Sequence, residues 1–213
     1  LVTELADLIR WADAQTSGTV PVGIGAAGLV NPNTGLVLTA NLMATGQPFP
    51  ADIARTVERP VTYVNDCRAL ALSEAIFGQG KGRRTVMALI LGTGVGGGIT
   101  VDGAILQGST HTGGEFGHTS APAYLVAKHD LPIWGCGCGR MGCIETYISG
   151  PGLVRLAKHI LGTDLTTAEI AARRDIDTGP VWRVWCDFSA DLLHSLTLTA
   201  DPDPVSYTHL RAH

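Results

Sequence analysis

Hydrophobic residues recur along this chain at two spacings, and the spacing changes from one segment to the next. Residues 19–30 and 61–66 are short apolar runs that end in glycine or polar residues, which is typical of buried strands. Residues 51–59 and 68–82 have helical spacing, and glycines end the second of them. Residues 85–106 are two apolar runs joined by glycines, which predicts a β-hairpin. Helices that interleave with buried strands indicate an α/β protein.

The later part of the chain has mainly helical periodicity, and neither end resembles a natural chain end. Residues 150–162 and 166–175 are predicted to be helical, and residues 192–203 are predicted to be a helix that runs into a turn. Leu1, Leu5 and Leu8 share helical spacing without a capping residue before them, so we expect native sequence upstream. Residues 204–213 show neither alternation nor a helical period. We expect them to be a tail foreign to the fold, with an irregular native terminus as the alternative.

Composition narrows the classes of protein. With 45% hydrophobic and 16% charged residues among 213, the chain can bury a core and is too apolar to be disordered. A net charge of −4 and 15 scattered basic residues form no obvious basic patch, so nucleic-acid binding is a minority interpretation. No apolar run reaches the roughly 18 residues of a membrane span, and acids interrupt the first apolar pattern. We therefore expect neither a membrane partner nor a signal peptide.

Three of the five cysteines follow a C-x-C-x4-C pattern, which suits metal ligands better than disulfides and favours a reducing cytoplasm. Zinc prefers four sulfur or nitrogen ligands, and four protein ligands leave no position for a reactive water. The expected ligands are Cys136, Cys138, Cys143 and His118. His118 is preferred to His111 and His129 because it lies one turn from Glu115. Such a metal would brace the loop that carries Glu115 and Glu145; free buried cysteines and a catalytic zinc are the alternatives.

Two further motifs are candidates for ligand binding. Residues 89–99, LILGTGVGGGI, could let backbone N–H groups approach a phosphate, but they match neither a P-loop nor a dinucleotide-binding turn. A hairpin turn over phosphates is predicted, and a hairpin without a ligand is the alternative. Asn65 and Asp66 follow a strand and precede a helix, where α/β sheets place ligands; a helix N-cap is the alternative for Asp66. Cys186 is expected to be a buried core thiol.

Taken in order, these motifs resemble a known family. The segments VNDCRALALSEAIFGQGKG, ILGTGVGGGI, GGEFGH and CGCGRMGCIETYISG are similar to the ROK family of sugar kinases and sugar-responsive repressors. The resemblance covers about residues 20–204. Its E-x-G-H motif followed by C-x-C-G-x-x-G-C-x-E is highly specific, and the match is strongest to the amino-sugar kinases of the family.

The resemblance implies a two-domain actin-like ATPase (ribonuclease H-like) α/β fold, truncated at both ends, with a zinc-binding loop. The implied parts are a small domain at 1–75, a larger domain at 76–204 and the tail at 205–213. The implied activity is ATP-dependent phosphorylation of the 6-hydroxyl of an N-acetylhexosamine, with N-acetylglucosamine first and N-acetylmannosamine or glucose as alternatives. ATP, Mg²⁺ and structural Zn²⁺ are the implied cofactors. Apolar helices at 153–162 and 182–196 allow a homodimer, although a helical core explains them without one.

The functional residues of the family carry over onto matching positions. Asp66 would be the catalytic base that takes the proton of the attacking hydroxyl. The residues implied to bind sugar are Asn65, Asp66, Glu115, His118 and Glu145. Those implied to bind ATP phosphates are Gly92, Thr93, Gly94, Gly96, Gly97 and Gly98. His118 would serve twice, with one ring nitrogen on zinc and the other toward a sugar hydroxyl.

Three departures from the family pattern limit the expected activity. The first phosphate loop of the family, D-x-G-x-T, would precede residue 1. Ala27 stands where the family often has proline, and the tail replaces a strand and a glycine-rich turn near the adenosine. We therefore expect this fragment alone to phosphorylate poorly. A sugar-sensing repressor with an upstream helix-turn-helix is the alternative function, and nucleic-acid binding is expected only in that case.

Overall fold

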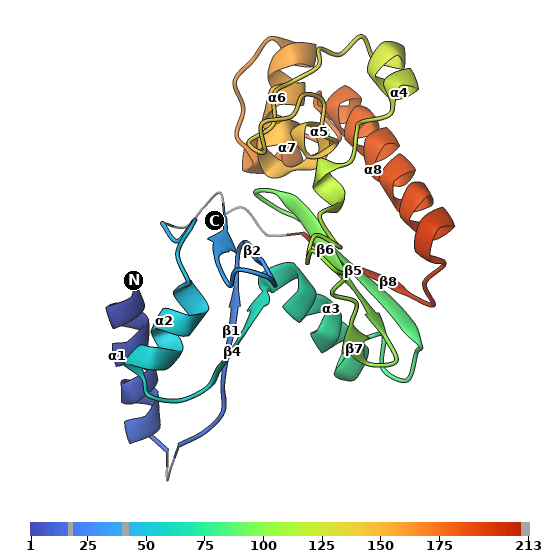
Figure 1. Cartoon of the computed structure of the whole chain (residues 1–213). Helices are drawn as coiled ribbons and strands as arrows, with labels where there is room; N and C mark the ends of the chain where they lie inside the picture. Colours follow the sequence, from blue (N-terminus) through green and yellow to red (C-terminus); the bar gives the residue numbers. More distant parts are fainter. Residues whose placement is uncertain (17–18, 40–42, 210–213) are drawn as a thin grey trace. The chain divides into compact units, whose positions relative to one another are not determined.

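The computed structural model describes residues 1–16, 19–39 and 43–209 and forms two compact units (Figure 1). Unit 1 is Leu1–Ala69 with Gln107–Gly113, and unit 2 is Leu70–Leu106 with Gly114–His213. The chain therefore passes between the units at three points: in the first turn of helix α3 (Asp66–Ile76), after residue 106 and after residue 113. The domain boundary expected from the sequence, between residues 75 and 76, lies at the end of α3, and the sequence did not indicate that residues 107–113 return to unit 1. The domain boundaries expected from the sequence therefore stay a prediction.

Unit 1 packs two helices against short strands. Its elements are α1 (Val2–Ala14), β1 (Val22–Ala26), β2 (Leu29–Val30), β3 (Val37–Leu38), α2 (Phe49–Thr56) and β4 (Val61–Asn65). Strands β1 and β4 pair in parallel, so their carboxyl ends lie at the same edge, and β2 and β3 form an antiparallel pair. The core contains Ile9 of α1 with Phe49 and Ile53 of α2. As its pattern indicated, α1 begins without a side-chain cap.

Unit 2 contains a four-stranded sheet in the order β7-β6-β5-β8. The strands are β5 (Thr85–Leu91), β6 (Val95–Val101), β7 (Ala104–Ile105) and β8 (Val205–His209). The predicted hairpin is confirmed, since β5 pairs antiparallel with β6 from Thr85 opposite Val101 to Leu91 opposite Val95. The glycine turn at 92–94 joins the two strands, so it lies at one end of the hairpin.

The helices of unit 2 that follow the hairpin lie mostly beside one another, whereas α3 lies apart from them (Figure 1). They are η1 (Phe116–His118), α4 (Ala123–Lys128), α5 (Glu145–Ile148), α6 (Gly150–Leu161), α7 (Thr167–Ala172) and α8 (Gly179–Ala200). Tyr147 of α5 stacks on Phe188 of α8 at a centroid distance of 4.8 Å and packs on Trp134 at 4.9 Å. Helices α6 and α8 each bury an apolar stripe in this core, which explains their hydrophobicity without a dimer. No helix in the described ranges is long and apolar enough to cross a membrane.

Two expectations from the sequence are corrected by the structure. Residues 205–209 are not irregular: they are strand β8, parallel to β5. That the tail is foreign to the natural protein stays a prediction. The register is held just before the strand, where the Asp203 carboxylate accepts the Thr85 N–H at 2.8 Å. Five residues are too few for the alternation of Val205 and Tyr207 with polar neighbours to stand out, and the partner strand is remote in sequence. Cys186 is exposed rather than buried, because it lies on the outer side of α8.

Candidate functional site

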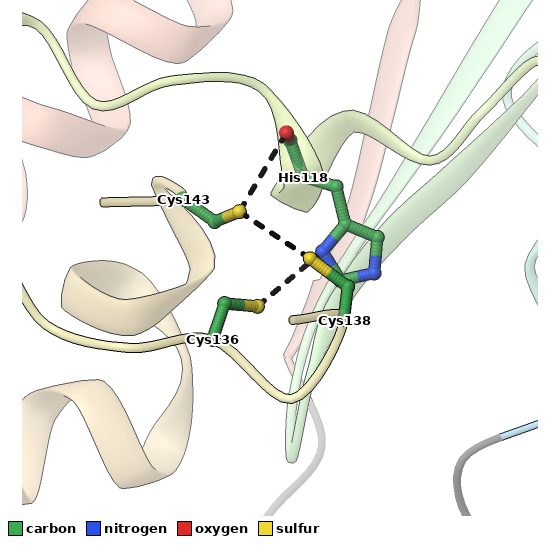
Figure 2. Close-up of side chains that lie close together, drawn as sticks. All are labelled: His118, Cys136, Cys138 and Cys143. Carbon is green, nitrogen blue, oxygen red and sulfur yellow. Dashed lines mark hydrogen bonds between the residues drawn. The ribbon is translucent and has the colours of Figure 1, made fainter. Parts of the chain in front are cut away.

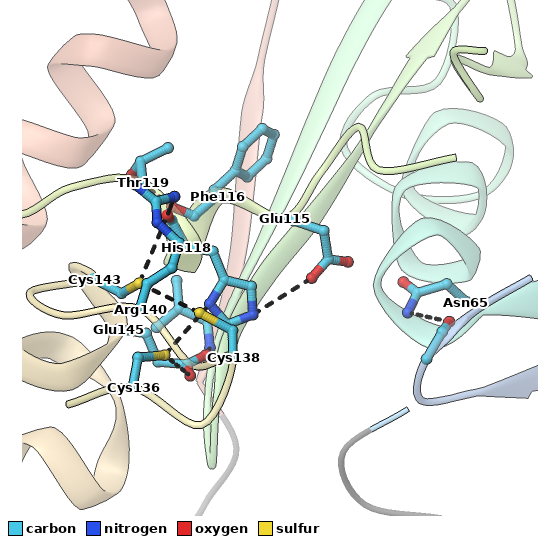
Figure 3. Close-up of polar contacts among 12 residues, drawn as sticks. Asn65, Glu115, Phe116, His118, Thr119, Cys136, Cys138, Arg140, Cys143 and Glu145 are labelled. Carbon is cyan, nitrogen blue, oxygen red and sulfur yellow. Dashed lines mark hydrogen bonds and ion pairs between the residues drawn. The ribbon is translucent and has the colours of Figure 1, made fainter. Parts of the chain in front are cut away.

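Asn65, the last residue of β4, caps helix α3. Its Oδ1 accepts hydrogen bonds from the N–H groups of Cys67 at 3.0 Å and Arg68 at 3.3 Å. Its Nδ2 donates to the Gly28 carbonyl at 3.1 Å, the contact drawn at Asn65 in Figure 3. Capping is therefore mainly the role of Asn65. Asp66 Oδ1 also accepts the Cys67 N–H, at 3.0 Å, but the Asp66 side chain is exposed. Its carboxylate stands at the carboxyl end of β4, as the sequence predicted.

The predicted metal ligands converge in unit 2 (Figure 2). One ligand atom each from His118, Cys136, Cys138 and Cys143 lies within 4.8 Å of all the others. His118 Nδ1 is 3.6 Å from Cys136 Sγ, and Cys138 Sγ is 3.6 Å from Cys143 Sγ. A tetrahedral zinc with ordinary bond lengths would separate two sulfurs by about 3.8 Å and a sulfur and a nitrogen by about 3.5 Å. These atoms therefore fit a tetrahedral site.

Three thiols in so small a volume affect one another's ionisation. Burial and the neighbouring thiols raise the pKa of Cys143 to about 12, and burial also raises the pKa of Cys136. At Cys138 burial raises the pKa, but hydrogen bonds from the Arg140 backbone and from the other thiols outweigh it and lower the pKa. A divalent cation would remove the mutual repulsion of the thiolates. The donor set thus suits a cation electrostatically as well as geometrically.

His118 faces two ways. Its Nδ1 points to the cysteine cluster, and its Nε2 lies 3.8 Å from Glu115 Oε2 (Figure 3). Arg140 donates to the His118 carbonyl at 2.9 Å, which fixes the backbone of η1 to the cysteine loop. The other two histidines considered as ligands lie elsewhere: His111 belongs to unit 1, and His129 Nε2 is 2.8 Å from Asp187 Oδ2.

Glu145 connects the cysteine loop with the glycine turn. Its Oε2 accepts the Val95 N–H at 2.7 Å, directly after the turn, and its Oε1 lies 3.7 Å from Cys136 Sγ. The turn is also held by the Gly150 N–H, which donates to the Gly92 carbonyl at 2.7 Å. A Cβ on Gly94 would lie 2.9 Å from Glu145 Oε2, so the carboxylate packs against a backbone without a side chain.

The structure brings most of the predicted site residues together in unit 2. The four metal ligands, both glutamates and the glycine turn are linked by the contacts above, whereas Asn65 and Asp66 lie together at the strand end in unit 1. Sequence patterns had not indicated that the Val95 N–H would bind Glu145 or that Arg140 would bind the His118 carbonyl. A backbone donor leaves no trace in a sequence, but a lone arginine between metal ligands is a signal that could have identified Arg140.

Comparison with known proteins identifies the relationship. The model of the family described as "ROK family" matches residues 1–206. The chain belongs to the ROK family. An N-acetylgalactosamine kinase, AgaK, from Shewanella sp. (strain ANA-3) is 41% identical over 203 residues, which cover 93% of this chain and 66% of that protein. An N-acetyl-D-glucosamine kinase from Yersinia pestis bv. Antiqua (strain Nepal516) is 44% identical over 175 residues, covering 81% of this chain and 68% of the relative.

Solved structures agree with this relationship. The ROK hexokinase from Thermus thermophilus matches 98% of this chain with a TM-score of 0.84 at 25% identity, and the match covers 69% of that protein. This ROK family member is thus an α/β protein whose structural neighbours have the actin-like ATPase fold. The chain spans 66% of the length of the Shewanella relative.

Proposed function

We propose that this chain is part of an ATP-dependent kinase that phosphorylates the 6-hydroxyl of an N-acetylhexosamine, with N-acetylglucosamine as the first candidate. The observation that carries the proposal is the exposed Asp66 carboxylate beside a fixed Asn65 at the carboxyl end of β4. Two of the relatives more than 40% identical to it are named as amino-sugar kinases, one for N-acetylgalactosamine and one for N-acetyl-D-glucosamine. N-acetylgalactosamine therefore joins N-acetylmannosamine and glucose as a substrate to be tested.

In this proposal Asp66 acts as the general base. The hydroxyl oxygen of the sugar attacks the γ-phosphorus of ATP, its proton moves to an Asp66 carboxylate oxygen, and ADP leaves. Because the Asp66 side chain is exposed, a substrate can reach its carboxylate. A side-chain amide carries two N–H groups, and among the described residues the Asn65 amide uses one of them, in its bond to Gly28. The other N–H can donate to a neighbouring sugar hydroxyl.

Glu115, Glu145 and His118 would supply the remaining sugar contacts. The Nε2 of His118 and the Glu115 carboxylate lie close enough to share one hydroxyl group of a sugar. Glu145 keeps Oε1 on the side of the cysteine loop while Oε2 binds Val95. Carboxylates and an imidazole at fixed positions can orient a pyranose so that one hydroxyl faces the base.

The glycine turn is the proposed contact for the ATP phosphates. Gly96, Gly97 and Gly98 lie inside β6, opposite β5, and the Gly92 N–H is bonded to the Gly94 carbonyl at 2.9 Å. Within the described residues, the N–H groups of Thr93 and Gly94 donate to no other group. Two free N–H groups at the tip of a turn can bind phosphate oxygens. Of the six predicted residues, these two are therefore the strongest candidates for direct contact.

The cysteine cluster would hold a structural zinc with His118, Cys136, Cys138 and Cys143 as ligands. Zinc bound by four protein ligands supplies no reactive water; it crosslinks the loop between η1 and α5. That loop begins next to Glu115 and ends at Glu145. The proposed role of the metal is thus to keep both glutamates in place, and Mg²⁺ would accompany ATP as the kinase relationship implies.

Replacement of Asp66 by Asn tests the proposed chemistry. We expect the Asp66→Asn protein, made from the complete reading frame, to lose about a hundredfold or more of its ADP release while still binding sugar. ADP release and calorimetric binding of N-acetylglucosamine measure the two effects. Asp7→Asn, on the exposed side of α1, is the matched control and should retain full turnover. Undiminished turnover by Asp66→Asn contradicts the assignment. Sugar binding without any turnover by the unmodified protein favours the repressor.

A further inference from the structure

Arg68 is an arginine buried in unit 1 in the first turn of α3, two residues after Asp66. Only 5% of it is exposed. Its Nε and one terminal nitrogen donate to the Gly113 carbonyl at 3.3 and 3.0 Å, and the same terminal nitrogen donates to the carbonyl of His111. Burying a guanidinium is costly unless its donors are used. An apolar side chain would have filled this space at lower cost, so the hydrogen bonds indicate a specific role.

The carbonyls that Arg68 binds belong to the returning segment Gln107–Gly113. This segment follows β7 of unit 2, joins unit 1 and then leads back into unit 2 at Gly114. Residues 107–110 are exposed, and His111 has a left-handed backbone conformation with φ of 56°. A side chain makes that conformation unfavourable, so the segment needs an anchor to hold it. Arg68 supplies three hydrogen bonds for this purpose.

The chain is also held just after the segment. Gly114 has φ of 101°, its carbonyl accepts the Gly97 N–H at 2.7 Å, and a Cβ on it would lie 2.2 Å from the Gly97 carbonyl oxygen. Glu115 follows immediately. Each residue of the Gly113–Gly114 peptide bond thus has a contact within its own unit: Gly113 with Arg68 in unit 1, and Gly114 with Gly97 in unit 2.

We propose that Arg68 is a positioning residue of the proposed sugar site: within unit 1 it ties the helix turn that begins with Asp66 to the segment Gln107–Gly113, which ends two residues before Glu115. The inference rests on the proposed function, because Asp66 and Glu115 matter together only if both act on one sugar. The hydrogen bond between Arg68 and Gly113 lies near two of the three points where the chain passes between the units: Arg68 is one residue before Ala69, and Gly113 is the last residue of its segment. A planar guanidinium can donate to two neighbouring carbonyls at once, whereas a lysine ammonium has no such fixed fork.

The test is Arg68→Lys, which keeps the positive charge and removes the planar set of N–H donors. The control is Arg59→Lys in the same unit, because Arg59 is also largely buried and binds Asp13 at 2.9 Å, away from the strand end. With protein from the complete reading frame, we expect Arg68→Lys to raise the KM for N-acetylglucosamine about tenfold or more and to leave the KM for ATP within about twofold. Amide hydrogen exchange at residues 111–115 should accelerate, and Arg59→Lys should change neither quantity.

Three outcomes would overturn the inference. In the first, the KM for the sugar stays within about twofold in Arg68→Lys. In the second, both KM values rise by the same factor, as expected for general destabilisation. In the third, hydrogen exchange at residues 111–115 is unchanged. If the unmodified protein neither binds nor phosphorylates any sugar, the proposed function fails and the sugar role of Arg68 fails with it. A working kinase with an unaffected Arg68→Lys variant rejects the positioning role alone.

Discussion

Gly97 shows that a single residue can be required for packing as well as for ligand approach. A Cβ at Gly97 would lie 2.3 Å from the Ala88 carbonyl oxygen and 2.6 Å from the ring of Phe116. The sequence favoured glycine here for phosphates, yet Gly97 lies inside β6 and its missing side chain lets Phe116 cover the strand. Because Phe116 adjoins Glu115 and begins η1, this close approach also sets the position of the candidate sugar ligands.

The substitution Gly97→Ala should therefore destabilise the protein. Neither the carbonyl of Ala88 nor the strand can move without breaking the hairpin, so we expect a loss of roughly 1–3 kcal/mol in the free energy of unfolding. Urea denaturation measures it. Gly23→Ala in β1 is the control, because no atom lies within 4 Å of its Cβ position. That change should cost less than about 0.5 kcal/mol. Equal effects of the two substitutions would contradict the packing role of Gly97.

At the same scale, the sequence was informative wherever a side chain carries the chemistry. The three cysteines and His118 could be predicted as a cluster because thiol and imidazole spacing is visible in a sequence, and the structure brings these groups together. The sequence could not predict that Asn65 would cap helix α3 while the Asp66 side chain stayed exposed. Either side chain can cap a helix, and only the backbone geometry shows that Asn65 Oδ1 accepts two N–H groups.

Among the elements, the loop between η1 and α5 depends most on the proposed metal. Few hydrogen bonds of regular secondary structure hold residues 119–144; they contain α4 and the isolated bridges Ser120 to Cys143 and Gly135 to Met141. Gly139 and Gly142 have φ of 86° and 67°, which lets the chain turn back between the cysteines. A crosslink by a metal would stabilise such a loop more than it would a helix or strand.

The zinc proposal predicts one equivalent of zinc per chain after purification under reducing conditions. Cys143→Ser should abolish zinc binding and lower the Tm by about 5 °C or more, because Cys143 is buried and its ligand position would be lost. Cys186→Ser, exposed and outside the cluster, should change neither value. Elemental analysis by mass spectrometry and thermal denaturation measure both. A fully folded, zinc-free unmodified protein would contradict the proposed metal site.

Elements of moderate length were predictable, and the shortest ones were not. The helices at α2, α3, α6 and α7 and the strands β4, β5 and β6 follow apolar periodicity and are confirmed. The pair β2 and β3, with two residues each, and α4, with six, give too few positions for a period to emerge. Strand β8 depends on pairing with β5, which is a tertiary effect that local propensity does not contain.

At the scale of the whole molecule, the returning segment Gln107–Gly113 was beyond sequence prediction. Its residues have no apolar period, and it belongs to unit 1 through contacts such as those of Arg68 with Gly113. Contacts between residues so distant in sequence follow from the folded backbone. The family resemblance led us to expect two domains, and only the structure shows the three points at which the chain passes from one unit to the other.

The two units should differ in local stability. Among the described residues, five buried hydrophobic side chains form the core cluster of unit 1, whereas eighteen form that of unit 2. Within the described ranges, unit 1 buries three polar side-chain atoms without hydrogen-bond partners, Tyr63 Oη and Arg59 Nε and Nη1, whereas unit 2 buries one, Ser189 Oγ; each such atom costs free energy. A smaller core and unpaired polar atoms both favour opening of unit 1 before unit 2.

Hydrogen exchange measured by NMR on the whole chain checks this difference. Amides that bond β1 to β4 should exchange about tenfold faster or more than those that bond β5 to β6, although both sets are paired in sheets. The comparison is matched because strand pairing protects each set until its own unit opens. N-acetylglucosamine should slow exchange in unit 1 if Asn65 and Asp66 bind it, because a ligand stabilises the state that it binds. Equal protection of the two sheets without sugar would mean that the units open as one cooperative body.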